Sequence, residues 1–92
     1  FGGNEQTVKM RFHNRYVGAV IDRFGKGVSL RPDGEEYFIA RAEAAVSEQF
    51  FGWVTGLGRD VQLLSPESVV EEYRELLKDL TEKYKEAGEE VC

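Results

Sequence analysis

The most informative stretch of the chain is WVTGLGRDVQLLSP, residues 53–66. It predicts the end of a helix at Gly58, then a short buried strand, then a final helix that begins at Pro66. Glycine readily adopts the left-handed conformation that closes a helix. Ser65 is a favourable N-cap, and proline suits the first position of a helix. The stretch therefore predicts a unit of helix, glycine, strand, Ser-Pro and helix.

Two elements are predicted upstream of a tight turn. Residues 7–13 alternate between apolar and polar side chains, which is typical of a half-buried strand. Its expected core side chains are Val8, Met10 and Phe12. A helix should follow, with Asn14 as a possible cap and Gly25 as its stop. Its apolar face is expected to contain Val17, Val20, Ile21 and Phe24.

The sequence Pro32-Asp33-Gly34 predicts the turn of a β-hairpin. Val28 and Leu30 mark the strand before it, and residues 37–43 form the strand after it. The side of the second strand that faces the core stays open. Tyr37 and Ile39 compete for that position with Phe38, Ala40 and Ala42.

A second helix is expected after Ser47, with Phe50, Phe51, Val54 and Leu57 as its apolar stripe. The final helix should cover residues 66–87, stop at Gly88, and measure roughly 33 Å. The element order is β-α-β-β-α-β followed by α. This order predicts an α+β fold, a ferredoxin-like βαββαβ sandwich with an added C-terminal helix. The first and third strands should be central, with two helices on one face of the sheet.

Composition indicates one small domain. The chain has 92 residues and a net charge of −5. Residues 66–92 carry all of that charge, with nine acids and four bases, whereas residues 7–31 hold six bases and one acid. The overall acidity argues against duplex DNA binding by this domain, because such binding depends on neutralising phosphates. An anionic small ligand at the basic end stays possible.

The two ends of the chain indicate the expected domain boundaries and the expected cellular setting. Residues 1–6 are expected to be a linker or fragment boundary, residues 7–88 the domain, and residues 89–92 a frayed tail. Cys92 has no partner for an internal disulfide, which is consistent with a reducing, cytoplasmic setting. The sequence has no apolar run of about 20 residues and no leader, so we expect no membrane span.

Several of these features together resemble one family. They are the Pro-Asp-Gly hairpin, Phe50-Phe51-Gly52-Trp53-Val54, Gly58, Val61-Gln62-Leu63-Leu64, Ser65-Pro66-Glu67 and a tyrosine-containing last helix. They resemble the C-terminal extension, or WCX domain, of bacterial WYL-domain transcriptional regulators, over about residues 7–86. The Trp-Tyr-Leu triplet of the neighbouring WYL domain and a basic DNA-reading helix pair are missing from this chain.

The resemblance implies a module that supports oligomer contacts and transmits an effector signal. Its expected partners are the WYL and helix-turn-helix domains of the full-length protein and a second copy in a homodimer. DNA would be reached only through the absent domain. The resemblance implies no catalysis here and no cofactor. An alternative is a stand-alone small-ligand-binding module, and a third interpretation is a non-catalytic subdomain of an enzyme.

The side chains of the open sheet face form the first candidate surface. By alternation this face should present the residues Lys9, Arg11, Arg31, Tyr37 and Arg41. The side chains expected in the core on the opposite side are Val8, Met10, Phe12, Val28 and Leu30. A cationic face with an aromatic suits a nucleotide, a nucleic-acid strand or an acidic surface. The alternative is a solvated face balanced by Glu35, Glu36 and Glu43.

The aromatic cluster and the last helix are candidate interfaces. Neighbouring helical residues are separated by about 100°, so one aromatic of the cluster is expected to point outward. Phe51 and Trp53 are the interface candidates, and core packing is the alternative. The last helix has two apolar stripes, so it can pack on the sandwich or pair with another subunit.

No catalytic or metal motif is evident. His13 is the sole histidine and has no nearby cysteine, so no metal site is expected. Gly56-Leu57-Gly58 and Gly25-Lys26-Gly27 lack the spacing of nucleotide-binding loops. We therefore expect that the domain is not an enzyme.

Overall fold

The computed structural model describes residues 4–91, with side chains described for residues 5–25 and 27–84. The elements are β1 (Asn4–His13), α1 (Val17–Phe24), β2 (Ser29–Asp33), β3 (Tyr37–Val46), α2 (Glu48–Gly56), β4 (Val61–Ser65) and α3 (Glu67–Val91). Two short 3-10 segments, Asn14–Tyr16 and Gly25–Gly27, flank α1. The expected α+β class is confirmed.

The four strands form one sheet in the order β2-β3-β1-β4, and all neighbouring pairs are antiparallel. Strands β1 and β3 are central, as expected. They pair over their full lengths, from Asn4 opposite Val46 to His13 opposite Tyr37. The strand thus begins at Asn4, so residues 4–6 belong to the sheet rather than to a linker. Residues 1–3 and Cys92, on which other expectations fell, lie outside the described residues.

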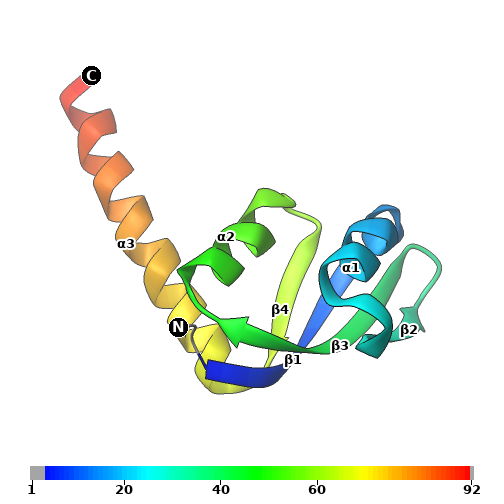
Figure 1. Ribbon diagram of the computed structural model, residues 1–92. Coiled ribbons are helices and arrows are strands. Elements are labelled where there is room, and N and C mark those ends of the chain that lie inside the picture. The colour runs from blue at the N-terminus through cyan, green and yellow to red at the C-terminus, as the bar shows by residue number, and fades with distance from the viewer. Residues whose placement is uncertain (1–3, 92) are drawn as a thin grey trace.

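Helices α1 and α2 lie on the same face of the sheet (Figure 1). The core lies between these helices and the sheet. Strand β3 alternates regularly, with Phe38 and Ala40 buried and Arg41 exposed. This alternation places Phe38 in the core and turns Tyr37 and Ile39 to the opposite face. The open question of which side of this strand faces the core is thereby answered. The fully buried side chains of the core are Phe12, Phe50, Met10, Val8, Val20, Val54 and Val69.

Helix α1 is only partly covered. Val20 is fully buried, but Val17 is 41% exposed and Ile21 is 46% exposed. The expected apolar face is therefore split between the core and the surface. The reason is that β2 is the edge strand and spans only five residues, so no further strand of the described chain covers the outer side of α1. Leu30 of β2, expected in the core, is also 39% exposed.

Helix α3 begins one residue later than expected. Ser65 is the last residue of β4, and the carbonyl of Pro66 accepts hydrogen bonds from the backbone N–H groups of Val69 and Val70. Pro66 therefore occupies the cap position that was expected for Ser65. The helix also continues through Gly88, where a stop was expected, because glycine within a helix is tolerated at a cost of about 1 kcal/mol.

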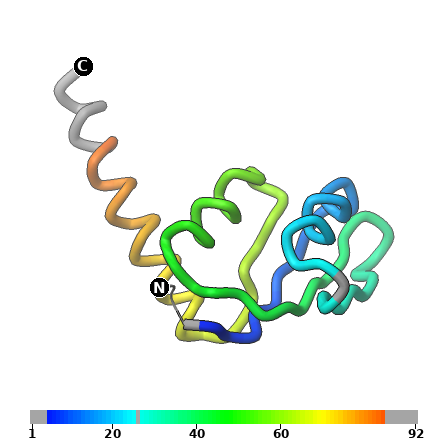
Figure 2. The backbone as a smooth tube through the Cα atoms, viewed as in Figure 1, coloured from blue at the N-terminus to red at the C-terminus, as the bar shows by residue number. Residues whose placement is uncertain are grey.

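Only the first turns of α3 pack against the rest of the domain. Val69 is fully buried, and the Tyr73 ring stacks on Phe51 with 5.1 Å between centroids. Further along, the helix leaves the sheet and projects from one end of the molecule (Figures 1 and 2). Leu77 and Leu80 are exposed there, and Tyr84 is 75% exposed.

Candidate partner and ligand surfaces

The sheet face opposite α1 and α2 gathers basic side chains. Strand pairing sets Lys9 of β1 beside Arg41 of β3, and Ser29 of β2 on the other side of Arg41. One step along, Ile39 lies between Arg11 and Arg31. The alternation predicted from the sequence therefore brings Lys9, Arg11, Arg31 and Arg41 together on one surface, which we call the basic face.

Three cations of the basic face have no acidic partner. Among the described side chains, Lys9, Arg31 and Arg41 form no ion pair. They surround Ile39 and Ser29 in a shallow hollow of 140 Å³, and a second hollow of 410 Å³ continues from Lys9 and Arg41 towards the end of β4. These three cations can therefore bind negatively charged groups of a ligand or partner, because no acid of the described chain pairs with them.

Arg11 differs from its neighbours on the basic face. Its Nε donates to Asp33 Oδ2 at 2.6 Å, and its guanidinium lies over the Tyr37 ring, 4.0 Å from the centroid. The acid that pairs with a cation of this face is therefore Asp33, whereas Glu35, Glu36 and Glu43, named in the alternative of a solvated face, form no ion pair in the described chain. With its charge already partnered, Arg11 is a weaker candidate for binding an external anion than Arg41.

A polar cluster around Asp60 adjoins the basic face. Arg15 donates to Asp60 Oδ2 at 2.5 Å, and Tyr37 donates to Oδ1 at 3.5 Å. The hydrogen bond from Arg15 holds the pKa of the Asp60 carboxyl below its ordinary value, and the same bond raises the pKa of Arg15. His13 accepts from the Arg15 N–H through Nδ1 at 3.1 Å, which caps the first 3-10 segment in place of Asn14.

Arg59 is a basic residue that the sequence analysis did not single out. It lines a small hollow of 70 Å³ together with Arg11, Tyr37 and Asp60. Its position directly after Gly58, in the loop that leads into β4, was the only available signal. The loop brings Arg59 to the basic face because β4 pairs with β1.

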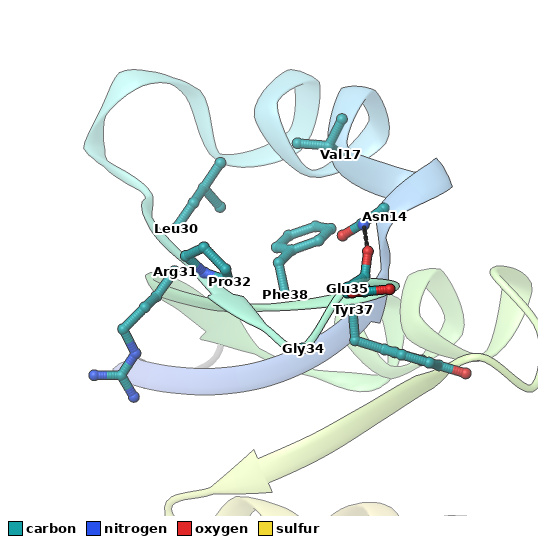
Figure 3. Close-up of a pocket in the computed structure, with 9 residues that line it drawn as sticks. All are labelled: Asn14, Val17, Leu30, Arg31, Pro32, Gly34, Glu35, Tyr37 and Phe38. Carbon is teal, nitrogen blue, oxygen red and sulfur yellow. Dashed lines mark hydrogen bonds between the residues drawn. The ribbon is translucent and has the colours of Figure 1, made fainter.

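An apolar groove lies on the other side of the sheet, between α1 and β2. The hollow has a volume of 420 Å³. Val17 lies above it and the Phe38 ring stands within it, while Leu30 and Pro32 form its β2 side (Figure 3). Arg31 and Tyr37 point away from the hollow (Figure 3). This groove was not predicted from the sequence, because Val17 was expected on the apolar face of its helix and Leu30 in the core.

The groove is closed at one end by the hairpin turn. Asn14 Nδ2 donates to the backbone carbonyl of Glu35 at 2.9 Å (Figure 3). Gly34 in the turn has a φ of 79°, a left-handed conformation that glycine adopts without a steric penalty. The Asn14 backbone N–H also donates to the carbonyl of Glu36 at 2.8 Å. The shape of the groove is therefore held by a turn and by two hydrogen bonds from Asn14 to the hairpin.

Comparison with known families gives one match. The model of the WCX domain matches residues 4–81, most of the chain. The chain belongs to the WCX domain family. Searches of curated proteins and of solved structures found no match.

The aromatic residues of this WCX domain are mainly core residues. Phe51, expected as an interface anchor, is only 4% exposed and stacks on Tyr73. Trp53 is half-buried, with its ring edge-on to Phe12 and Phe24. Phe51 is therefore covered by α3, whereas Trp53 stays partly exposed, with the Arg23 guanidinium over its ring at 5.4 Å from the centroid.

Two further findings apply to the described part of the WCX domain. Its His, Cys, Asp and Glu side chains form no group of three that could hold a metal ion. Within residues 4–91, no helix combines the length and apolar character needed to cross a bilayer.

Proposed function

We propose that this WCX domain is the C-terminal regulatory module of a bacterial WYL-type transcriptional regulator. In this proposal it helps sense an anionic effector, supports dimer contacts, and catalyses no reaction. Its partners are the WYL and helix-turn-helix domains of a cytoplasmic regulator, and DNA is bound only through those domains. Membership in the WCX family supports the regulatory context.

We also assign the sandwich to the ferredoxin-like group. The support is the chain order β1-α1-β2-β3-α2-β4 together with the central position of β1 and β3. In this arrangement both helices cover one face and leave the other face available for a neighbour.

The observation that carries the sensing proposal is the group of three unpartnered cations, Lys9, Arg31 and Arg41, on the uncovered face. An anionic group placed among them gains charge-assisted contacts of up to about 1 kcal/mol each at these solvent-accessible positions. Because each 1.4 kcal/mol corresponds to about tenfold in affinity, two such contacts would account for a useful effector response.

The test uses the full-length regulator with Arg41→Glu and, separately, Arg31→Glu. We expect each variant to weaken the effector-dependent change in DNA binding by about tenfold or more. The matched control is Lys78→Glu on α3, an exposed lysine without an ion pair in the described chain whose replacement changes the charge by the same amount. An unchanged response in both variants would refute the sensing role of the basic face.

A second candidate function is a stand-alone small-ligand-binding module. The groove between α1 and β2 favours it, since 420 Å³ lies within the range of about 300–1,000 Å³ that small-ligand sites occupy. This candidate expects apolar amino acids to raise the melting temperature of the 92-residue chain by itself. Saturation at a hundred times Kd would add about 2.7 kcal/mol of stability, and no shift at millimolar ligand would exclude it.

A further inference from the structure

The large apolar side chains that remain exposed fall into two separate groups. Six are exposed in the described chain, and their division is three and three: Val17, Ile21 and Leu30 at the α1–β2 end, and Leu77, Leu80 and Tyr84 on the outer part of α3. We call them the groove patch and the α3 stripe. They lie at opposite ends of a molecule 47 Å long (Figure 1). A single chain therefore cannot use one to cover the other.

We propose that the α3 stripe of one copy seats on the groove patch of a second copy, and that the second copy returns the same contact. This inference rests on the dimer contacts of the proposed function and names the two surfaces that make them. A reciprocal exchange has two-fold symmetry, in which each copy gives its helix and receives its partner's helix.

The shapes of the two surfaces agree. The stripe residues follow one another at spacings of three and four, which sets them on one face of the helix. Within the groove patch, Val17 of α1 and Leu30 of the facing strand line a hollow, and Ile21 lies one turn from Val17 on α1, outside the lining of the hollow. Its hollow of 420 Å³ is open above Phe38 and can receive a leucine or tyrosine side chain (Figure 3).

The charges beside the two surfaces are also complementary. With about 100° per residue, Arg74 and Lys83 fall roughly 90° to either side of the stripe, whereas Glu75 and Glu82 fall on the opposite face of α3. Arg74 pairs with Glu71, so Lys83 is the base beside the stripe that forms no ion pair in the described chain. On the groove patch the matching acid is Glu35, which lines the hollow and forms no ion pair in the described chain, while Arg31 of the same lining points away (Figure 3).

Pairing between two α3 helices is the main competing arrangement. It would bury the stripe but leave Val17, Ile21 and Leu30 exposed in both copies. The reciprocal exchange covers both surfaces and makes the contact twice. Because the contact is made twice, the buried surface area is doubled and comes closer to the roughly 1,200–2,000 Å² that stable interfaces bury.

The test measures the mass of the 92-residue chain by analytical ultracentrifugation over a range of concentrations. We expect the unmodified chain to dimerise, and both Leu80→Glu and Ile21→Glu to weaken dimerisation by at least tenfold. Both sites are exposed, so neither change disturbs the core, and circular dichroism checks that each variant folds. Gln49→Glu, on the exposed side of α2, is the control and should leave the dimer intact.

Mixing the two variants gives the decisive measurement. The Ile21→Glu copy keeps its stripe and the Leu80→Glu copy keeps its groove, so one of the two contacts can re-form. We expect the equimolar mixture to dimerise more tightly than either variant alone and less tightly than the unmodified chain. A second measurement uses Ile21→Cys and Leu80→Cys in a Cys92→Ser background, which should form a disulfide with each other on mixing.

The remaining outcomes separate this inference from the proposed function. If Leu80→Glu breaks the dimer but Ile21→Glu does not, or if Leu80→Cys forms a disulfide with itself, then α3 pairs with α3 and the exchange is refuted while dimer contacts stand. If the unmodified chain is monomeric at all concentrations, both the exchange and the dimer part of the proposed function fail. The effector response of the basic face is tested separately.

Discussion

Asp60 is a single residue whose side chain and backbone together contact three other parts of the chain at one end of the sheet. Its carboxylate accepts from Arg15 and Tyr37, and its backbone carbonyl accepts from the N–H of His13 at 3.1 Å. Arg15 is exposed and Asp60 and Tyr37 are only half-buried, so each contact contributes modestly. Together they tie the loop before β4 to the end of β1.

The lowered pKa of Asp60 predicts a pH dependence of stability. A carboxyl with a lower pKa in the folded state stabilises the fold at pH values above its unfolded pKa, and this contribution is lost as the pH falls through the folded value. The ordinary value is 3.8. We therefore expect Asp60→Asn to be less stable than the unmodified chain at pH 7, with the difference shrinking below pH 3.8. Urea unfolding at several pH values checks this.

The control for this prediction is Asp79→Asn, on the exposed surface of α3, which forms no ion pair in the described chain. It should leave the stability at pH 7 within about 0.5 kcal/mol of that of the unmodified chain. If the difference in unfolding free energy between the Asp60→Asn variant and the unmodified chain were the same at every pH, the carboxylate charge would play no part in stability.

Two glycines, one within α2 and one just after it, should have opposite effects on stability when they are replaced by alanine. Gly52 lies within α2, is exposed, and has open space where a Cβ would stand. Gly58 follows α2 with a φ of 97°, a conformation that other residues rarely adopt. We expect Gly52→Ala to stabilise the domain by about 0.5–1 kcal/mol and Gly58→Ala to destabilise it by about 1–2 kcal/mol.

Urea midpoints of the two glycine variants give the measurement, and each variant serves as the control for the other because both changes add one methyl group. Equal effects of the same sign would contradict the helix end at this position. The stop signal at Gly58 was read correctly from the sequence, whereas the one at Gly88 was not. The difference is that Gly58 leads directly into a strand of the sheet, while α3 beyond Tyr73 leaves the sheet and has no such partner that requires a stop.

The whole molecule divides into a packed sandwich and a projecting rod. Val69 and Tyr73 attach α3 to the sandwich, and the exposed stripe begins at Leu77. We therefore predict that a chain ending at residue 76 folds cooperatively. Its unfolding free energy should lie within about 1 kcal/mol of that of the full chain when both are measured at concentrations where the chain is monomeric.

Urea unfolding followed by circular dichroism measures this stability, with a chain ending at Pro66 as the control. That shorter chain loses Val69 and Tyr73, leaves Phe51 uncovered, and should unfold. Failure of the chain ending at residue 76 to fold would show that the outer part of α3 supports the sandwich. The same truncation should abolish the proposed exchange between copies.

The elements, their order and the basic character of one sheet face were all predictable from local sequence patterns. Alternation, turn residues and helical spacing act between near neighbours, so Lys9, Arg31 and Arg41 could be assigned to one surface without coordinates. The pairing of Asp33 with Arg11, the covering of Phe51 by Tyr73, and the exposure of Val17, Ile21 and Leu30 became visible in the folded molecule alone. Those outcomes depend on which distant element packs where. In particular, a five-residue edge strand cannot cover the outer side of α1, and no local pattern reports that.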